Sequence, residues 1–306
     1  MKRTFLFTLA VAALSGCSGE PEVAHTLERV GQASFAIETC TDGIDNNLNG
    51  LVDCADVTCS AAANCATQTP CDGQVLNVRA NTGILWRVNT AVPNLGVLDV
   101  TTLGAPHNAL GYNFNDGFYY AVRTSDNHFI RLSRNGTSFI STDLGAPAGL
   151  SAFKTSAAFD ASGNWWSTNA GGNMAFIDVS APTPTLQIVP VATAITGADM
   201  AFDPDHNRFY SVNGNTLESL DMATLVLTNQ FITGSLATGA QGTQWFDADG
   251  FLYAIENAAG LIRQIDVATG VAVAVGTVAP PATPNDGAAC AFAAPPFEFC
   301  TNGIDD

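Results

Sequence analysis

The feature that most constrains the fold is an internal repeat with a period near 44 residues. A turn residue followed by a short apolar segment occurs five times, at intervals of 44, 46, 44 and 43 residues: Gly73, Gly117, Gly163, Asn207 and Gly250. Another short segment repeats with the same period and ends at Tyr112, Phe159, Phe202, Phe246 and Phe292. The first four of these ends lie just upstream of the turns at Gly117, Gly163, Asn207 and Gly250. Because both marks keep one period, the sequence predicts similar units built from short strands.

This period is typical of the blades of a β-propeller, which have four short strands each. The first unit begins at its second strand, Val75–Val78, and the last unit ends after its first strand, Cys290–Phe292. Pairing these two segments would complete one blade and leave no open ring. We therefore predict an all-β protein with a five-bladed propeller over residues 71–295, closed by its N- and C-terminal strands. A sixth, degenerate blade, an open β-solenoid and a β-sandwich are the alternatives.

Several segments of the repeat are similar to a known family. Asn108–Asn113, Asp116–Val122 and Asn285–Cys290, with Cys71-Asp72-Gly73 at the start, resemble bacterial and fungal surface β-propellers of unknown function. The resemblance implies a propeller and a secreted location, and it implies no activity.

The N-terminus has the pattern of an export signal. Lys2 and Arg3 precede an apolar run over residues 5–14, and Leu14-Ser15-Gly16 precedes Cys17. Such a segment is too short to span a bilayer and is typical of a secretory signal. It resembles a bacterial lipoprotein signal, which implies a signal peptide over 1–16, lipid on Cys17 and a tether over 17–37. Ser18 in the next place favours the outer membrane or cell surface. An ordinary signal peptide is the alternative.

The chain has 8 cysteines, which apart from Cys17 cluster near the two ends of the predicted propeller. In an exported protein such clusters predict disulfides. The candidates are Cys40, Cys54, Cys59, Cys65, Cys71 and Cys290. A Cys71–Cys290 bond would latch the ring, but a simple hairpin register places Cys290 opposite Leu76, so Cys65–Cys71 is the alternative. Cys300 is expected to lack a partner.

Residues 38–70 form a cysteine-rich module that contains a metal-loop pattern. The segment Asp45–Asp56, here called the acidic loop, matches the calcium-loop pattern except that its last position is Asp instead of Glu. Calcium prefers about seven oxygen ligands, and Gly50 permits the sharp turn that gathers them. The predicted ligands are Asp45, Asn47, Asn49, the carbonyl of Leu51, Asp53 through water, and Asp56. No amphipathic helix flanks the loop, so cysteines are expected to frame it.

The module also resembles a metal-binding motif of bacterial cell-surface proteins, in which Asp often stands where this chain has Asn47 and Asn49. Fewer carboxylates imply weak calcium binding, with a Kd of about 10⁻⁴–10⁻³ M. A metal-free turn region held by disulfides, or zinc on thiolates, are the alternatives. Residues 296–306 repeat the opening of the motif and stop before its glycine and second cysteine, so we expect no working site there.

Charge limits the function. The chain has 11 Lys+Arg against 28 Asp+Glu, a net charge of −17, which argues against nucleic-acid partners. No nucleophile–base set is recognisable, so no catalytic residue is assigned. The histidines, expected to be solvated loop residues, are dispersed: His25, His107, His128 and His206.

Two functions follow. One is a non-catalytic binding or structural module, lipid-anchored, with a protein or glycan partner and a weak calcium loop. The other resembles propellers of the gluconolactonase type: a metal-dependent, lactonase-like hydrolase that uses the central channel. Of the predicted inner strands only the one with Asp199 brings a charge, so a channel metal lacks ligands. Two or more carboxylates converging near an Asn would favour the enzyme, and an apolar or Ser/Thr-lined channel the binding module.

Overall fold

The computed structural model of the chain describes residues 37–88, 97–169, 172–237, 239–278 and 284–294. The predicted signal peptide, Cys17, the tether up to residue 36 and the C-terminal repeat with Cys300 lie outside the described residues.

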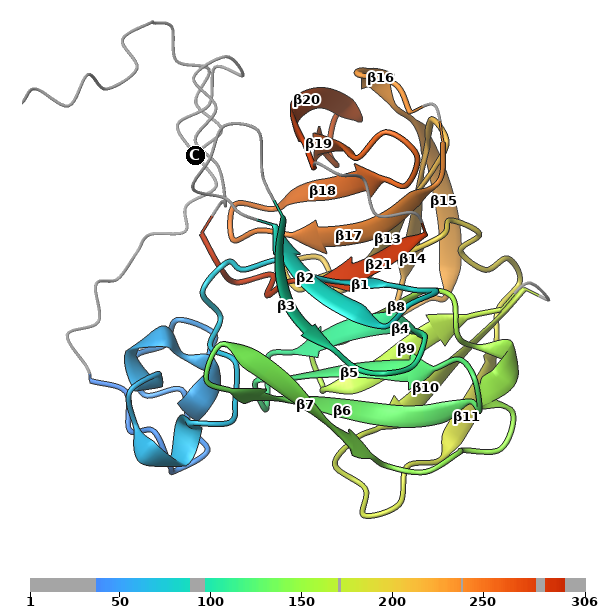
Figure 1. Cartoon of the computed structure of the whole chain (residues 1–306). Helices are drawn as coiled ribbons and strands as arrows, with labels where there is room; N and C mark the ends of the chain where they lie inside the picture. Colours follow the sequence, from blue (N-terminus) through green and yellow to red (C-terminus); the bar gives the residue numbers. More distant parts are fainter. Residues whose placement is uncertain (1–36, 89–96, 170–171, 238, 279–283, 295–306) are drawn as a thin grey trace, which may run out of the picture.

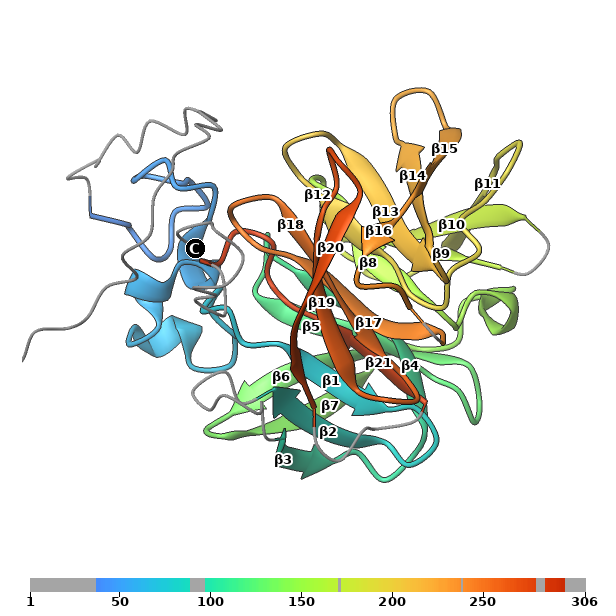
Figure 2. The ribbon, with the colours of Figure 1, turned by 90° about the horizontal axis from the view of Figure 1, so that it is seen from above.

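Five four-stranded antiparallel units, here called blades 1 to 5, surround a common axis in the described part of the chain (Figures 1 and 2), as predicted. Blade 1 consists of β21 (Asn285–Ala288), β1 (Leu76–Arg79), β2 (Ile84–Val88) and β3 (Val97–Thr102). Blade 2 consists of β4 (His107–Asn113), β5 (Phe118–Arg123), β6 (His128–Asn135) and β7 (Ser138–Asp143). Blade 3 consists of β8 (Ala157–Phe159), β9 (Asn164–Thr168), β10 (Asn173–Asp178) and β11 (Leu186–Pro190).

The remaining blades follow the same order from the axis outwards. Blade 4 consists of β12 (Ala201–Asp203), β13 (Arg208–Asn213), β14 (Thr216–Asp221) and β15 (Val226–Phe231). Blade 5 consists of β17 (Gln241–Phe246), β18 (Phe251–Glu256), β19 (Leu261–Asp266) and β20 (Val271–Thr277), and the short β16 (Thr233–Gly234) adds to it in parallel. The innermost strands β21, β4, β8, β12 and β17 contact one another in a closed ring.

Blade 1 is built from both ends of the propeller, as predicted, because β21 pairs with β1. The predicted position of the closing strand, Cys290–Phe292, is wrong: the strand is Asn285–Ala288, and Ala288 lies opposite Leu76. The prediction placed the strand from the spacing of aromatic residues, and this spacing does not hold in the closing strand. Phe292 lies beyond the strand and packs edge-on against Phe114, with ring centroids 5.0 Å apart.

The disulfide Cys71–Cys290 joins the two ends of the propeller across a sequence separation of 219 residues. The expected register, with Cys290 opposite Leu76, is wrong by two residues, which carries Cys290 past the end of β1. A bend at Gly73, with φ of +76°, brings Cys71 to meet it at a Cα–Cα distance of 5.3 Å. The alternative Cys65–Cys71 pairing is wrong, because the module contains the bonds Cys40–Cys59 and Cys54–Cys65.

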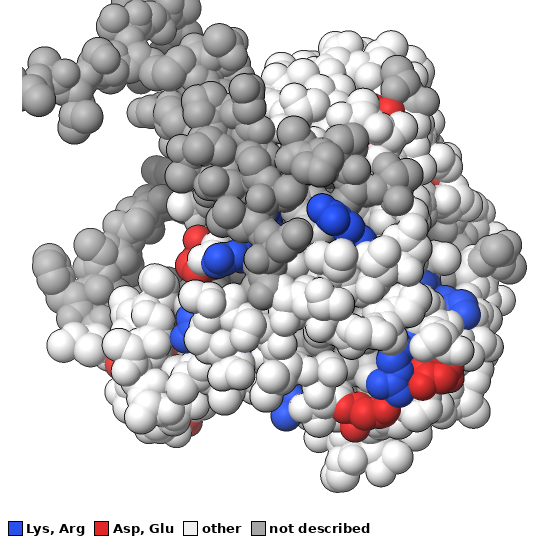
Figure 3. Space-filling model, viewed as in Figure 1, with Lys and Arg blue, Asp and Glu red and all other residues white. Residues whose placement is uncertain are grey.

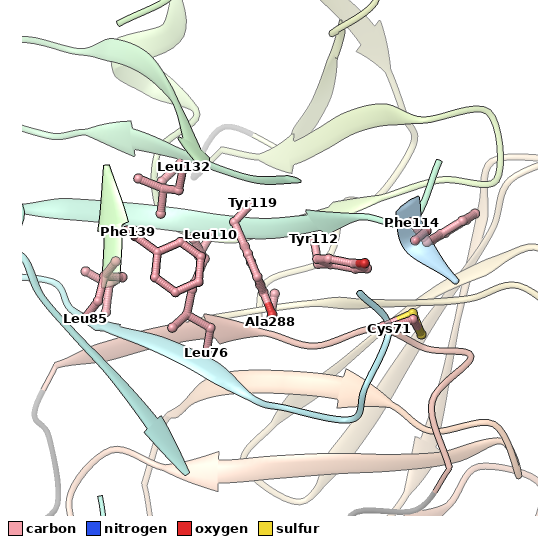
Figure 4. Packing of buried hydrophobic residues seen from close by; sticks show 14 of the residues in the cluster. Cys71, Leu76, Leu85, Leu110, Tyr112, Phe114, Tyr119, Leu132, Phe139 and Ala288 are labelled. Carbon is pink, nitrogen blue, oxygen red and sulfur yellow. A yellow bond between two sulfur atoms is a disulfide. The ribbon is translucent and has the colours of Figure 1, made fainter. Parts of the chain in front are cut away.

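The hydrophobic core of the propeller is divided into clusters that each lie between two neighbouring blades. Alternation along a strand sends neighbouring side chains to opposite faces. Trp165 of β9 therefore packs in the cluster between blades 2 and 3, whereas Trp166 packs between blades 3 and 4. Figure 4 shows the cluster between blades 1 and 2, where Leu76, Leu110 and Tyr119 meet. Every blade thus buries both faces, and none is complete without its two neighbours.

The cysteine-rich module packs directly on the propeller beside blade 2 (Figure 1). It contains three short 3₁₀ helices, η1 (Asp53–Ala55), η2 (Val57–Cys59) and η3 (Ala63–Cys65). The side chains of Leu51 and Ala55 belong to the core cluster between blades 1 and 2. Backbone N–H groups join the two parts: Thr69 donates to the carbonyl of Gly117, and Arg134 donates to that of Thr67, both at 2.7 Å. The module is therefore part of the same packed body.

We expect the latch disulfide to stabilise the fold more than either module disulfide. The chain-entropy model gives about 5 kcal/mol for the Cys71–Cys290 bond and about 3 kcal/mol for Cys40–Cys59, because the closed loop is longer. The Cys71→Ala/Cys290→Ala variant should therefore lose about 2 kcal/mol more than Cys40→Ala/Cys59→Ala in urea unfolding without reductant. Equal losses would show that the latch bond does not constrain the ring.

Candidate functional site

Four of the predicted calcium ligands lie together in the acidic loop. The carboxylate of Asp56 accepts hydrogen bonds from the side-chain amides of Asn47 at 2.7 Å and Asn49 at 2.8 Å. The carboxylate of Asp45 accepts from the backbone N–H groups of Asn49 at 3.1 Å and Gly50 at 2.8 Å. Positive φ at Gly50, +87°, makes the turn that this arrangement needs.

The other two predicted ligands lie differently. Asp53 accepts hydrogen bonds from the backbone N–H groups of Asp42 at 3.2 Å and Gly43 at 3.1 Å. Its carboxylate therefore holds the backbone at the start of the module. Leu51 is buried in the core between blades 1 and 2, and its N–H donates to the Asn49 side chain at 2.9 Å. The positions of both are fixed by the fold of the module.

Glu38 is a residue of this module that the motif did not identify. It is buried, and its carboxylate accepts from the backbone N–H groups of Asn46, Asn47 and Asp53 at 2.9, 3.3 and 3.1 Å. The signal was available in the sequence: a Glu stands two residues before the cysteine in both copies of the motif, at Glu38 and Glu298.

The donor set of the acidic loop fits a hard cation. Burial by itself would raise the pKa of Asp56, but hydrogen bonds from Thr58, Asn47 and Asn49 hold that pKa below its ordinary value, so the carboxylate is ionised. A half-turn of each amide would present its oxygen to the side of Asp56, and oxygen ligands suit calcium. The turn would cost the bonds that these oxygens accept from the backbone N–H groups of Asn49 and Leu51. The cysteines of the module are bonded in disulfides and offer no thiolate to zinc. The described residues contain no group of three or more His, Cys, Asp or Glu placed to hold a metal.

The acidic loop touches the segment that closes the propeller. A Cβ atom added at Gly50 would lie 3.1 Å from the ring of Phe292. Phe292 follows the latch cysteine Cys290 by two residues and packs against the core between blades 1 and 2. The acidic loop therefore lies against the segment that follows the latch cysteine.

A second candidate site lies on the propeller axis. The expectation that only Asp199 brings a charge to the inner strands is wrong, because β21 brings Asp286 to the same place. Asp286 accepts a hydrogen bond from the N–H of Leu110 at 2.5 Å, and Asp199 accepts from the N–H of Gln244 at 2.9 Å. The two side chains are 0% and 1% exposed, and the Oδ1 atom of each has no N–H or O–H donor among the described residues.

The pKa of each carboxyl group in the pair is raised. Burial raises the pKa of Asp286 to about 8, and burial together with the charge of Asp286 raises the pKa of Asp199 well above its ordinary value. The two carboxyl groups lie close enough for a proton to be shared between them. A β-bulge in β4, where Ala109 has φ of +57°, turns the N–H groups of Ala109 and Leu110 toward Asp286. Non-glycine residues in this conformation are strained, and such strain often marks functional positions.

The space around the pair is small and filled. Thr243 Oγ1 lies within hydrogen-bonding distance of the Asn77 and Asn285 side chains, 2.6 Å from the latter. A cavity of about 30 Å³ lies on the axis, lined mainly by small and aromatic side chains such as Ala157 and Phe246. Such a space holds about two water molecules, whereas small-molecule pockets measure about 300–1,000 Å³.

The described histidines do not complete a catalytic set. His107 is buried, which corrects the expectation of a solvated loop residue, and its Nδ1 lies 2.7 Å from the Ala105 carbonyl. His128 and His206 pair with Asp143 at 2.8 Å and Asp203 at 2.7 Å. Burial lowers the pKa of His107, so its ring is neutral.

The geometry defines the class: a five-bladed β-propeller latched by a disulfide and carrying a cysteine-framed acidic loop. Residues 89–292 match the family described as "Repeat of unknown function (DUF6923)", and the chain belongs to this family. Residues 1–18 match a prokaryotic membrane lipoprotein lipid attachment site, so the protein is exported and lipid-anchored. The search of curated proteins finds no match.

Solved structures similar to this chain are distant in sequence. Virginiamycin B lyase from Staphylococcus aureus has 13% identity and a TM-score of 0.42, over 69% of this chain and 68% of that one. A structural genomics protein of unknown function from Bacteroides thetaiotaomicron has 11% identity and a TM-score of 0.46, over 66% and 58%. A nidogen/laminin complex has 15% identity and a TM-score of 0.46, over 71% and 98%.

The contact between the acidic loop and the closing segment can be tested with two glycines of the same module. Gly43 and Gly50 both have positive φ, but only a side chain at Gly50 would meet Phe292. Gly43→Ala should cost about 1–2 kcal/mol from backbone strain, and Gly50→Ala about 1–3 kcal/mol more from overpacking. In a Phe292→Ala background the extra cost should vanish, as measured by urea unfolding. An extra cost that persists there would contradict the contact.

Proposed function

We propose that this lipoprotein is a non-catalytic binding module that presents its propeller to a protein or glycan partner at the outer membrane or cell surface. The observation that carries the proposal is the filled axis. With an axial cavity of about 30 Å³, recognition would use the exterior of the propeller. Much of the face in Figure 3 carries no charged side chain, which suits contact with an uncharged partner surface.

Attachment to the membrane would run through lipid on Cys17, which lies within the matched lipoprotein segment. Among the described residues no helix is long and apolar enough to cross a bilayer. The residue after Cys17 is Ser18, which favours the outer membrane or cell surface as the destination. The tether between Cys17 and the module would set the reach of the propeller from the bilayer.

The acidic loop would bind calcium weakly and stiffen the contact between module and propeller. Support comes from the convergence of Asn47 and Asn49 on Asp56, and from the contact of Gly50 with Phe292. In this proposal calcium supplies rigidity, and the chain's own residues supply the partner surface.

A metal-dependent, lactonase-like hydrolase is the second candidate. One observation favours it: Asp199 and Asp286 converge on the axis, and Asn77 and Asn285 meet at Thr243 of the neighbouring inner strand. Against it stand the complete burial of both carboxyls and the protons that they hold at neutral pH, since a metal ligand must be deprotonated.

Calcium should raise the stability of the protein. At 10 mM calcium and a Kd of about 10⁻⁴–10⁻³ M, the expected gain is about 1.4–2.7 kcal/mol. Thermal melting of the mature protein with calcium, and again with chelator, measures it.

The matched variants for this experiment lie three residues apart. Asp45→Asn should abolish the calcium shift, whereas Asp42→Asn, the same change outside the predicted ligand set, should leave it unchanged. A melt indifferent to calcium and chelator would remove the calcium assignment.

The two candidate functions differ in an activity assay. Purified mature protein with calcium or magnesium should hydrolyse gluconolactone no faster than buffer does, and should bind members of an array of bacterial surface glycans or crosslink to a surface protein on intact cells. Lactone turnover that is lost in Asp199→Asn would favour the hydrolase. The absence of both glycan binding and a crosslinked partner would contradict the binding module.

A further inference from the structure

The axial carboxyl pair connects four of the five blades. Asp286 belongs to β21 of blade 1 and accepts from the N–H of Leu110 in blade 2. Asp199 lies at the entry to β12 of blade 4 and accepts from the N–H of Gln244 in blade 5. A proton shared between the two carboxyl groups would therefore complete a link across the axis.

The Oδ1 atoms of Asp199 and Asp286 need a proton or a cation between them. Two buried carboxylates at close range repel each other strongly unless a proton or a cation lies between them. The Oδ1 atoms of Asp199 and Asp286 have no donor among the described residues, and the charged group that acts on Asp199 is Asp286 itself.

A proton fits this space better than a metal ion. Calcium requires six to eight oxygen ligands, and magnesium requires a full octahedron. The pair offers two free carboxylate oxygens, and the neighbouring cavity of about 30 Å³, lined in part by Met200 and Gln244, has room for about two waters. This set falls short of the coordination that either cation needs.

We propose that Asp199 and Asp286 share a proton on the propeller axis, and that this shared proton is a pH-sensitive lock that holds blades 1, 2, 4 and 5 together. The lock is closed in acidic and neutral surroundings and opens in alkaline ones. It is independent of the calcium loop and of any partner. The strained bulge at Ala109 belongs to it, because the bulge supplies the N–H groups that hold Asp286.

The sign of the pH dependence follows from the protons bound. An unfolded Asp loses its proton near pH 3.9, whereas the folded pair keeps at least one proton to about pH 8. The folded state therefore binds more protons between these values, and its stability falls as the pH rises. The other titratable side chains on the inner strands and β1 are Arg79, His107, Tyr112 and Asp203.

Other groups contribute to the pH dependence, so a difference measurement is needed. Burial raises the pKa of Asp247 to about 6 and lowers that of His107. Asp199→Asn keeps the shape of the side chain and gives Asp286 a permanent donor, so the variant needs no shared proton. Asp247 and His107 are present in both the wild type and the variant, so their contributions to the pH dependence cancel in the comparison.

The experiment compares urea unfolding of wild type and Asp199→Asn from pH 6.5 to 9. The wild type should release one more proton on unfolding than the variant does. Its folding equilibrium constant should therefore fall relative to that of the variant by about tenfold per pH unit, up to about pH 8. Asp249→Asn, an exposed Asp in a turn, is the control and should follow the wild type. Parallel curves for wild type and Asp199→Asn would overturn the proposal.

A second measurement covers the case in which Asp199→Asn does not fold. Carbon-13 NMR of the wild-type aspartate carboxyls should show the pair still protonated at pH 7 and titrating near or above pH 8. Two axial carboxyls that titrate near pH 4 would overturn the lock. A shift of the same signals by calcium or magnesium at pH 7 would also overturn it, since it would place a cation where we propose a proton.

Discussion

Closure of the ring is the constraint on which the rest of this structure depends. Each core cluster lies between two blades, so an open ring would expose the inner faces of its two terminal blades. Blade 1 cannot form until β21, from the far end of the chain, pairs with β1. This pairing joins residues more than 200 positions apart, and the entropy of closing such a loop must be offset by contacts made only when the ring is complete.

The sequence predicted the number of blades and the means of closure because both are repeated locally. Gly73 and Gly250 mark equivalent turns, and the strands after them carry the same alternation of apolar residues. The exact closing strand was not predictable from aromatic spacing. The pair Ala288–Leu76 in blade 1 is equivalent to the pair Trp245–Tyr253 in blade 5. The position that is aromatic in the other inner strands is therefore Ala289 in blade 1, and Phe292 lies outside the strand.

The two candidate sites also differ in how far the sequence predicts them, because one is a local motif and the other depends on pairing between distant strands. The acidic loop is a local motif, so Asp45, Asn47, Asn49 and Asp56 were found by spacing, and the structure brings them together. Its anchor Glu38 lies outside the calcium-loop pattern, and its hydrogen bonds show its role. The Asp199–Asp286 pair depends on the register of β21, and an error of a few residues in that register removes Asp286 from the axis.

The stretch from Asp286 to Phe292 therefore concentrates the attachments that keep the ring shut. Asp286 bonds across the axis, Ala288 ends the ladder with β1, Cys290 bonds covalently to Cys71, and Phe292 packs on Gly50 of the acidic loop. The disulfide responds to the redox state of the surroundings, and the axial pair responds to proton concentration. Because all of them act on one short segment, the loss of any one weakens the same pairing of β21 with β1. An oxidising exterior at neutral or acidic pH favours the disulfide and the shared proton together, which agrees with the exported, lipid-anchored location of the chain.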